Sequence, residues 1–365
     1  MKKVEIFFKN LFLQWILLTG RKKKAGGLIH LNPGDKIACI RLNRIGDALV
    51  VTPLLHLLKQ RTGCSITVIA DRHNHFVFRN NPDIDNILIF EKGSNGTRSI
   101  ISKLNRGNFK AFIDLHDDVS VTVSYIVSKL KINRITGLEK GNRPLFTNTV
   151  PRLDSTKRHV IERTLKLAEM FADRDGNVII PTEGDGVIRY QPTTENIETV
   201  GRYFESKFPE KKFVVGINIS AGSMARYWGT KNFRDLVELL KKRGLEYLLL
   251  CSTRDINLAL EIDPYSERTY YTPDFGEFAA MVGKVDLLFS PDTATVHLAS
   301  LHGVPVFGLY VKYDTEDIIW YPYNSRYEVV VTKEPTLRDV RFSKVIEKFE
   351  PFLKNELELY ENSRL

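Results

Sequence analysis

The chain has 365 residues, of which 43% are hydrophobic and 27% are charged. This length exceeds what one hydrophobic core usually organises and predicts two folded domains, and the absence of a short repeat or a low-complexity tract argues against a solenoid. The 53 lysines and arginines outnumber the 44 aspartates and glutamates, and the formal charge of +9 favours an anionic partner without distinguishing nucleic acid, acidic lipid and phosphorylated substrate.

Residues 1–30 form a first segment that differs from the rest of the chain. Large apolar residues dominate positions 4–18, polar residues interrupt them, and basic residues flank them, including the run from Arg21 to Lys24. The apolar stretch is too short and too polar to cross a bilayer, and no signal-peptide cleavage site follows it. We expect a basic amphipathic helix whose aromatic residues enter the headgroup region of a membrane. The alternative is a helix that docks on the protein's own surface. The aromatic residues are Phe7, Phe8, Phe12 and Trp15.

From Lys36 onward, strand-like and helix-like runs alternate. Apolar runs bounded by turn residues predict strands, and apolar residues at helical spacing predict helices. This alternation predicts a parallel sheet that is covered by helices on both faces. We expect strands at 37–42, 65–70, 87–90 and 111–115, and helices at 48–60, 73–81, 119–130 and 159–171.

Residues 173–191 are rich in glycine, proline, aspartate and threonine and are interpreted as an interdomain connection. A second alternating series follows, so the chain contains two similar α/β halves. Its expected strands are 213–219, 247–251, 285–289 and 304–309, its helices are 233–243, 276–283 and 296–301, and residues 337–360 form a terminal amphipathic helix.

The first candidate site is the run Arg41-Leu42-Asn43-Arg44-Ile45-Gly46-Asp47, which closes the first strand and opens the first helix. Gly46 offers backbone freedom there, and Asp47 stands beyond the carboxyl end of the sheet, where such folds bind ligands. Asp47 has two interpretations. It is either a helix cap, the commoner use of such an aspartate, or a catalytic base that requires a substrate hydroxyl within hydrogen-bond reach.

Several common sites are missing from the sequence. The segment Arg44–Ala48 holds one of the three glycines of a dinucleotide fingerprint, and no P-loop pattern is present. The acidic group at 114–118 is interpreted as a strand end with a cleft-facing loop rather than as a metal site. We therefore expect neither a metal nor a cofactor. The three scattered cysteines, Cys39, Cys64 and Cys251, predict buried free thiols in a reducing compartment.

Two further candidate sites follow strands of the second half. In the segment Ser220–Trp228, small residues allow a ligand to approach the backbone, and Arg226 offers a bidentate cation for phosphate. The alternative is a surface turn. In the segment Ser290–His297, Asp292 or Thr293 caps a helix whose free N–H groups attract phosphate. The alternative here is an ordinary cap with a solvated histidine.

Together these segments resemble glycosyltransferase family 9, the ADP-heptose:lipopolysaccharide heptosyltransferases. Arg41–Asp47 resembles the family's opening motif, Ser220–Trp228 its Gly-(Ala/Ser)-x-x-x-(Lys/Arg)-x-Trp segment, and Asp292–His297 its Asp-Thr-Gly-x-x-His signature. Supporting matches lie at 81–85, at 113–116 and around Pro305. The resemblance spans about residues 37–310, with the motifs in the family's order and spacing.

The resemblance implies an α/β enzyme of the GT-B class, with two Rossmann-like domains whose parallel sheets face each other across a cleft. Residues 31–185 would form the acceptor-binding domain and 186–335 the nucleotide-sugar-binding domain, and the terminal helix at 336–365 would pack back across the cleft. Catalysis would be inverting and metal-independent, with Asp47 as the base. The donor and its phosphates would contact Ser220, Gly222, Arg226, Asp292, Thr293, Ala294 and His297, and the acceptor side would hold Arg41, Asn43, Arg44, Gly46 and His116.

The implied partners are ADP-heptose as the donor, a lipid-linked oligosaccharide such as lipopolysaccharide core as the acceptor, and a membrane surface that residues 1–24 contact. The implied location is the cytoplasm, peripheral on the inner face of the cytoplasmic membrane. Ala294 replaces the family's usual glycine, so a transferase that uses another nucleotide sugar, a hexose or an N-acetylhexosamine, stays open. A non-catalytic glycan- or nucleotide-binding protein is a further alternative. Nucleic acid ranks last, because only charge supports it.

Overall fold

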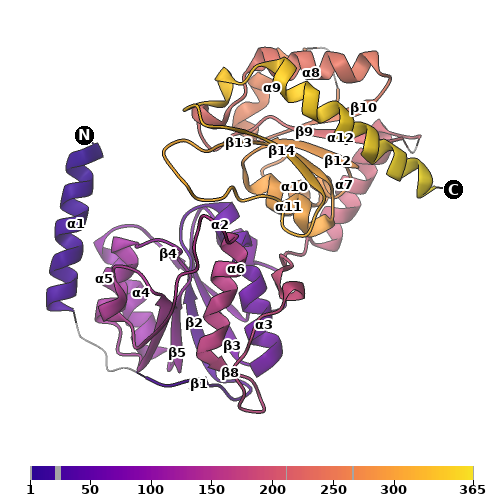
Figure 1. Ribbon diagram of the computed structural model, residues 1–365. Coiled ribbons are helices and arrows are strands. Elements are labelled where there is room, and N and C mark those ends of the chain that lie inside the picture. Colours follow the sequence, from indigo (N-terminus) through magenta and orange to yellow (C-terminus); the bar gives the residue numbers. More distant parts are fainter. Residues whose placement is uncertain (1, 21–25, 211, 265–266, 365) are drawn as a thin grey trace. The chain divides into compact units, whose positions relative to one another are not determined.

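The computed structural model describes residues 2–20, 26–210, 212–264 and 267–364. Its chain divides into two compact units, Met1–Tyr190 (unit 1) and Gln191–Leu365 (unit 2), and each is described by itself (Figure 1). That the two sheets face each other across a cleft stays a prediction. The basic run from Arg21 to Lys24 lies outside the described residues.

Unit 1 is built on a six-stranded sheet with the strand order β4-β3-β2-β5-β6-β7, in which every neighbouring pair is parallel. The order reverses between β2 and β5, so a switch point lies where their carboxyl ends diverge. The strands are β2 (Lys36–Ile40), β3 (Ser65–Asp71), β4 (Asn86–Phe90), β5 (Ala111–Asp114), β6 (Arg134–Leu138) and β7 (Asn148–Val150), and β1 (Ile29–His30) pairs separately with β8 (Phe171–Ala172).

Helices cover both faces of this sheet (Figure 1). On one face, residues of α4 and α5 join apolar strand residues such as Ile40 and Phe112 in a buried cluster. The helices of unit 1 are α1 (Lys2–Thr19), α2 (Ile45–Leu49), α3 (Thr52–Thr62), α4 (Ser94–Arg106), α5 (Val121–Lys129) and α6 (Val160–Leu165), with 3-10 turns at His75–Phe78, Arg143–Leu145, Lys166–Met170 and Glu183–Gly186.

The single helix expected at 48–60 is two helices, α2 and α3. The break has a local cause, because Pro53 has no backbone N–H to donate to the carbonyl of Leu49. The Thr52 hydroxyl donates to that carbonyl instead, at 2.7 Å. The break places α2 as a short separate helix at the carboxyl end of β2, where it carries Asp47.

Unit 2 repeats the plan of unit 1. Its six strands follow the order β11-β10-β9-β12-β13-β14, again with all neighbours parallel, and the order reverses between β9 and β12. Both units therefore have the doubly wound arrangement of Rossmann-like domains, as predicted. The strands are β9 (Val214–Asn218), β10 (Glu246–Cys251), β11 (Thr269–Tyr271), β12 (Leu287–Pro291), β13 (Val306–Val311) and β14 (Tyr327–Thr332).

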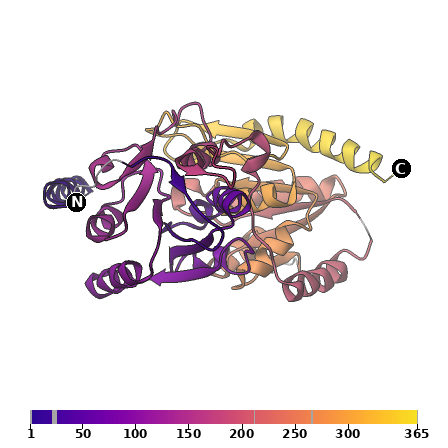
Figure 2. The same ribbon diagram turned by 90° about the horizontal axis from the view of Figure 1, so that it is seen from below.

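The helices of unit 2 also lie on both faces of its sheet (Figures 1 and 2). Phe349 and Leu353 of the terminal helix belong to a buried cluster of unit 2, together with Trp228 and strand residues. The terminal helix thus packs on the unit that contains it. The helices are α7 (Thr194–Lys207), α8 (Thr230–Lys242), α9 (Ile256–Ile262), α10 (Phe275–Val282), α11 (Ala294–His302) and α12 (Phe342–Asn362), with 3-10 turns at Met224–Arg226, Thr253–Asp255 and Leu337–Asp339.

The N-terminal segment forms a helix, α1, which contacts α5 of unit 1. Within the described ranges, none of the helices is both long enough and apolar enough to cross a membrane. All three cysteines are buried free thiols, as the sequence predicts.

Candidate functional site

In unit 2 the predicted donor residues gather at the carboxyl ends of β9 and β12. Thr293 is the N-cap of α11, and its hydroxyl accepts a hydrogen bond from the amide of Thr295 at 3.3 Å. The first turn of this helix therefore begins at the switch point of the sheet, where doubly wound folds bind phosphates. Of the two expected caps, Thr293 is the one that the structure uses.

Arg226 and Asp292 form an ion pair beside this helix start. Nη2 of Arg226 lies 3.2 Å from a carboxylate oxygen of Asp292, and Nη1 donates to the Asp292 carbonyl at 3.3 Å. Arg226 lies in the 3-10 turn after β9, and its side chain is 35% exposed, so part of the guanidinium faces solvent. It holds a positive charge next to the α11 N-terminus, where a diphosphate would need it.

His297 lies one turn into α11 and is 2% exposed. The alternative of a solvated histidine is therefore wrong. Its ring centre is 6.2 Å from that of Trp320, whose carbonyl accepts a hydrogen bond from the Tyr310 hydroxyl at 3.2 Å. Trp320 lies in the loop after β13, and this aromatic side chain at the donor end of the sheet was missed by sequence reasoning.

Asn218, the last residue of β9, joins the loops at the switch point. Its side-chain amide donates to the hydroxyls of Ser290 at 2.9 Å and of Thr293 at 3.0 Å, and the residue is 1% exposed. This residue was also missed, although a polar residue that ends a buried strand is a usable signal. It fixes the α11 cap relative to β9.

Ser220 belongs to a second polar group, at the ends of β9 and β10. Its hydroxyl donates to the carboxylate of Asp255 at 2.5 Å and accepts from the amide of Ser252 at 2.8 Å. In doubly wound folds an acidic residue after the second strand commonly binds ribose, and Asp255 follows β10 in this way. Beside this group, a Cβ on Gly222 would meet no atom within 4 Å, so this loop borders open space.

In unit 1, Asp47 lies in the first turn of α2, and the N-cap of that helix is Arg44. The interpretation of Asp47 as a helix cap is therefore wrong. Its carboxylate is instead ion-paired with Arg41, which is 5% exposed. Arg41 also donates to the carbonyls of Asp47 at 3.2 Å and of Leu115 at 2.9 Å. Arg41 thus holds Asp47 against the end of β5.

The backbone freedom expected at Gly46 occurs at Asn43. Gly46 is a regular residue of α2, whereas Asn43 has a φ of 86°, in the left-handed region that asparagine tolerates. The amide of Asn43 donates to the carboxylate of Asp71 at 2.9 Å, which fixes this turn. Asn43 and Arg44 are both exposed at the carboxyl end of the sheet.

His116 is buried at the same end of unit 1, and both ring nitrogens have partners. The amide of Leu42 donates to Nε2 at 3.3 Å, so Nδ1 carries the proton and donates to Asp114 at 2.8 Å. Burial lowers the pKa of His116, and the nearby Asp114 only partly opposes this. The neutral ring therefore joins the ends of β2 and β5.

Lys140, after β6, completes this buried group and was missed by sequence reasoning. Its ammonium lies 2.9 Å from the Asp114 carboxylate and donates to the carbonyl of His116 at 2.5 Å. Burial raises the pKa of Asp114, but Lys140 and His116 outweigh burial and hold it well below its usual range. Asp114 is thus a charged structural residue. Among the described residues, no group of three or more His, Cys, Asp or Glu side chains is arranged to hold a metal ion.

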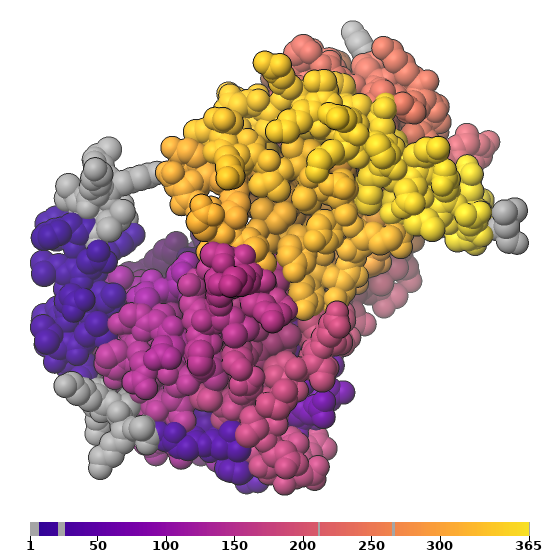
Figure 3. Space-filling model, in the orientation of Figure 1, coloured from indigo at the N-terminus to yellow at the C-terminus, as the bar shows by residue number. Residues whose placement is uncertain are grey.

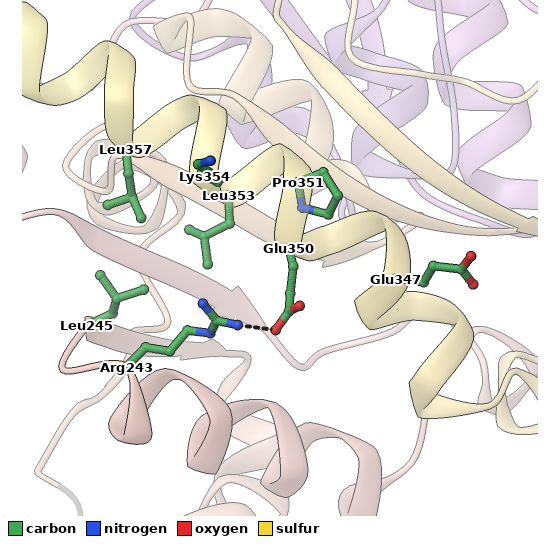
Figure 4. Close-up of a pocket in the computed structure, with 8 residues that line it drawn as sticks. All are labelled: Arg243, Leu245, Glu347, Glu350, Pro351, Leu353, Lys354 and Leu357. Carbon is green, nitrogen blue, oxygen red and sulfur yellow. Dashed lines mark hydrogen bonds and ion pairs between the residues drawn. The ribbon is translucent and has the colours of Figure 1, made fainter.

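A surface pocket of about 660 Å³ lies elsewhere on unit 2 (Figure 4). It lies between the end of α8 and α12, where Arg243 and Glu350 form an ion pair and Leu245 and Leu353 form an apolar floor. Because Leu245 immediately precedes β10, the pocket is at the amino end of that strand. The donor residues lie at the carboxyl ends of the strands, so the pocket is at the other end of the sheet.

The family model of glycosyltransferase family 9 (heptosyltransferase) matches residues 97–349. The chain belongs to this family. It is therefore a glycosyltransferase, and the alternative of a non-catalytic binding protein is wrong. The matched residues include all the predicted donor residues, whereas Asp47 precedes them, so its assignment depends on the motif resemblance alone.

Similar proteins agree with this membership. The chain is 23% identical to lipopolysaccharide heptosyltransferase 3 of Escherichia coli (strain K12), over 82% of this chain and 91% of that protein. It is 22% identical to the lipopolysaccharide core heptosyltransferase OpsX of Haemophilus influenzae, over 82% of this chain and 85% of that protein.

Solved structures show that the fold is shared. A glycosyl transferase family 9 protein from Veillonella parvula DSM 2008 has a TM-score of 0.72 and 20% identity, over 88% of this chain and 98% of that one. The E. coli ADP-heptose lps heptosyltransferase II has a TM-score of 0.67 and 17% identity, over 88% of this chain and 99% of that one. The predicted GT-B class of fold is thereby confirmed.

Proposed function

We propose that this glycosyltransferase moves a heptose from ADP-heptose to the core of lipopolysaccharide. The observation that carries the proposal is the family match, within which both similar curated proteins are heptosyltransferases of lipopolysaccharide. The donor end of unit 2 supports it, because Arg226 and the start of α11 offer positive charge where a nucleoside diphosphate would lie.

The donor side of the reaction uses the residues of unit 2. The N–H groups of the first turn of α11 would bind the diphosphate, and Arg226 would offset the negative charge that grows on it as the glycosidic bond breaks. Asp292 keeps Arg226 in place through their ion pair. Because this positive charge comes from the protein, transfer is metal-independent, and His297 and Ser220 position the donor.

The acceptor side uses Asp47. The carboxylate would remove the proton from the acceptor hydroxyl as this hydroxyl attacks the anomeric carbon, and the diphosphate would leave from the opposite face of the sugar, with inversion. The ion pair with Arg41 supports this role, because it fixes the orientation of the carboxylate. Asn43 and Arg44 lie exposed beside Asp47, on the side where the acceptor would bind.

The acceptor is proposed to be lipid-linked, and the enzyme to work as a peripheral protein on the cytoplasmic face of the membrane. The supporting observation is the N-terminal helix α1, which exposes large apolar side chains. Exposed apolar patches mark surfaces that bind a membrane or another protein, and a membrane carries the lipid-linked acceptor.

A second candidate donor is another nucleotide sugar, and Ala294 favours it. This residue is the first of α11 and replaces the glycine that the family signature carries there. Its methyl group would lie next to the donor phosphates if they bind at the start of α11. A nucleotide sugar that leaves room for this methyl group is therefore the alternative donor.

One experiment tests the proposal. The purified protein is incubated with lipopolysaccharide core acceptor and a panel of nucleotide sugars, and nucleoside diphosphate release is followed. ADP-heptose should be consumed, and Asp47→Asn should lower the rate by about 10²- to 10⁴-fold. The matched control is Asp235→Asn on α8, which should keep the full rate. Full activity of Asp47→Asn would refute its role, and consumption of a different sugar would assign the second candidate.

A further inference from the structure

The N-terminal helix α1 has two apolar faces, and only one of them is covered by the protein. On the inner face, Ile16 is 1% exposed and belongs to the buried cluster of unit 1, and Leu17 packs against that cluster. Gly20 continues this face, because a Cβ there would lie 2.9 Å from the Leu145 side chain. Helix α1 is thus docked on unit 1, as one of the two sequence interpretations predicted.

The other face exposes a continuous apolar surface. Phe7 and Leu18 are 62% and 82% exposed. With 3.6 residues per turn, the row of positions 7, 11, 15 and 18 lies on the side of the helix opposite Ile16, Leu17 and Gly20. We call this surface the outer face of α1, and its members are Phe7, Phe8, Leu11, Phe12, Trp15 and Leu18. Figure 3 shows the helix at the surface of unit 1.

The outer face continues onto the neighbouring helix α5. The rings of Phe12 and Tyr125 are stacked with centres 6.1 Å apart, and the ammonium of Lys129 lies 5.7 Å from the Tyr125 ring centre. Figures 1 and 2 both show α1 alongside α5. Lys129 is exposed and places a positive charge beside the aromatic surface.

We propose that the outer face of α1, together with Lys129 of α5, binds the surface of an anionic bilayer while α1 stays docked on unit 1. The inference rests on the proposed function in one respect, because a lipid-linked acceptor lies in such a bilayer. It adds that α1 is a rigid part of unit 1 rather than a free tether. The membrane therefore fixes the orientation of the acceptor-binding unit.

The composition of the surface selects a bilayer over a second copy of this chain. Large aromatic side chains beside lysines are typical of helices that lie in the headgroup region of acidic membranes. A helix of this length is about 27 Å long and about 10 Å wide, so one face offers about 270 Å², whereas a stable dimer buries about 800 Å² on each partner. The net charge of +9 also opposes self-association and favours acidic lipid.

The first test is binding to vesicles without any sugar donor. The full-length protein is sedimented with phosphatidylcholine vesicles that contain phosphatidylglycerol, and with vesicles of phosphatidylcholine alone. We expect Leu11→Ser/Trp15→Ser to lower the partition coefficient at least about tenfold. The matched control is Asn10→Ser, an exposed polar position of the same helix, which should bind like the wild type. Unchanged binding by the double variant would overturn the proposal.

The second test asks whether α1 is docked and which side meets lipid. Amides of α1 should be protected from hydrogen exchange without vesicles, and rapid exchange there would show a free tether. Brominated lipid should quench a part of the tryptophan fluorescence that is lost in Trp15→Phe. Self-association that vanishes in Leu11→Ser/Trp15→Ser, with no vesicle binding by the wild type, would assign the outer face to a second copy.

Transfer to a core fragment without its lipid anchor separates this inference from the proposed function. Leu11→Ser/Trp15→Ser should keep the wild-type rate on this fragment, because the outer face is remote in sequence from the predicted site residues. If the wild type transfers no sugar yet binds vesicles, the proposed function fails and the membrane surface stands. If the wild type transfers sugar but binds no vesicles, the transfer of heptose stands and the membrane surface is refuted.

Discussion

At the scale of single residues, the most informative contact is that between Arg41 and Asp47. Arg41 reaches three acceptors, the carboxylate and carbonyl of Asp47 and the carbonyl of Leu115, so its planar guanidinium fixes the direction of the proposed base. A lysine at position 41 would keep the positive charge but would lose the planar group that donates to several acceptors at once. The sequence shows both residues, but it does not show that they contact each other.

We therefore expect Arg41→Lys to lower kcat by about tenfold or more while the donor KM stays unchanged, because a small displacement of a catalytic group is costly. Steady-state rates at saturating acceptor, with the donor varied, measure both constants. The control is Arg98→Lys, an exposed arginine of α4 whose charge is kept. An equal loss of kcat in both variants would contradict a specific positioning role.

His116 predicts a pH dependence of stability. Its pKa is lowered in the folded protein, chiefly by burial, so the unfolded chain binds the proton more readily. The resulting stability is fully present above the unfolded pKa, near 6.5, and is lost as the pH falls from there toward the folded pKa.

Urea unfolding at a series of pH values between about 7.5 and 5 measures this effect. His116→Gln has no group that titrates there, so we expect the free energy of unfolding to vary less with pH in this variant. His302 of unit 2 also has a lowered pKa, because its ring is partly shielded from solvent, and it adds its own pH dependence to the stability of both proteins. The informative quantity is therefore the difference in the free energy of unfolding between the wild type and His116→Gln. If this difference does not change with pH, His116 does not cause the pH dependence.

At the scale of elements, most of the wholly buried strands were predicted, except β6, and two helices with few buried residues were missed. Strands β2, β3, β5, β9 and β10 are almost wholly buried and read as apolar runs. Helix α4 buries only Ile100 and Leu104, and α7 buries only Val200, so each contributes few residues to the core. Tertiary packing stabilises such helices, and a single sequence does not display it.

The junction of α2 and α3 yields a prediction at this scale. The buried hydroxyl of Thr52 donates to the Leu49 carbonyl at 2.7 Å and accepts from the amide of Arg189 at 2.9 Å. It thereby ties the end of unit 1 to the helix pair that carries Asp47. Thr52→Val leaves both backbone groups without this partner.

We expect Thr52→Val to lower the free energy of unfolding by about 1–3 kcal/mol, because buried backbone groups lose their hydrogen bonds. Chemical denaturation measures the change. Thr52→Ser keeps the hydroxyl and should lose clearly less. If the valine variant were as stable as the serine variant, the hydroxyl would not be what holds this junction.

At the scale of the whole molecule, the alternation of strands and helices was enough to predict two doubly wound units, and the strand orders agree with it. The candidate site was predictable where the motifs follow strands, as at Arg226, Asp292 and Thr293. It was not predictable where the partners are distant in sequence. Asn218 and Ser290 are 72 residues apart, and Lys140 reaches Asp114 from the next strand.

The proposed assignment of the donor to unit 2 makes a prediction about donor binding to the intact chain. If ADP occupies the proposed donor site, the amides of residues 220–226 and 291–297 should exchange more slowly with solvent, while the core strands of unit 1 should be unaffected. Ligand at about 100 times its Kd should stabilise unit 2 by about 2.7 kcal/mol. Hydrogen exchange with and without ADP measures both effects. Arg226→Ala should weaken the protection if the guanidinium binds the diphosphate. Protection confined to unit 1 would refute the assignment of the donor site to unit 2.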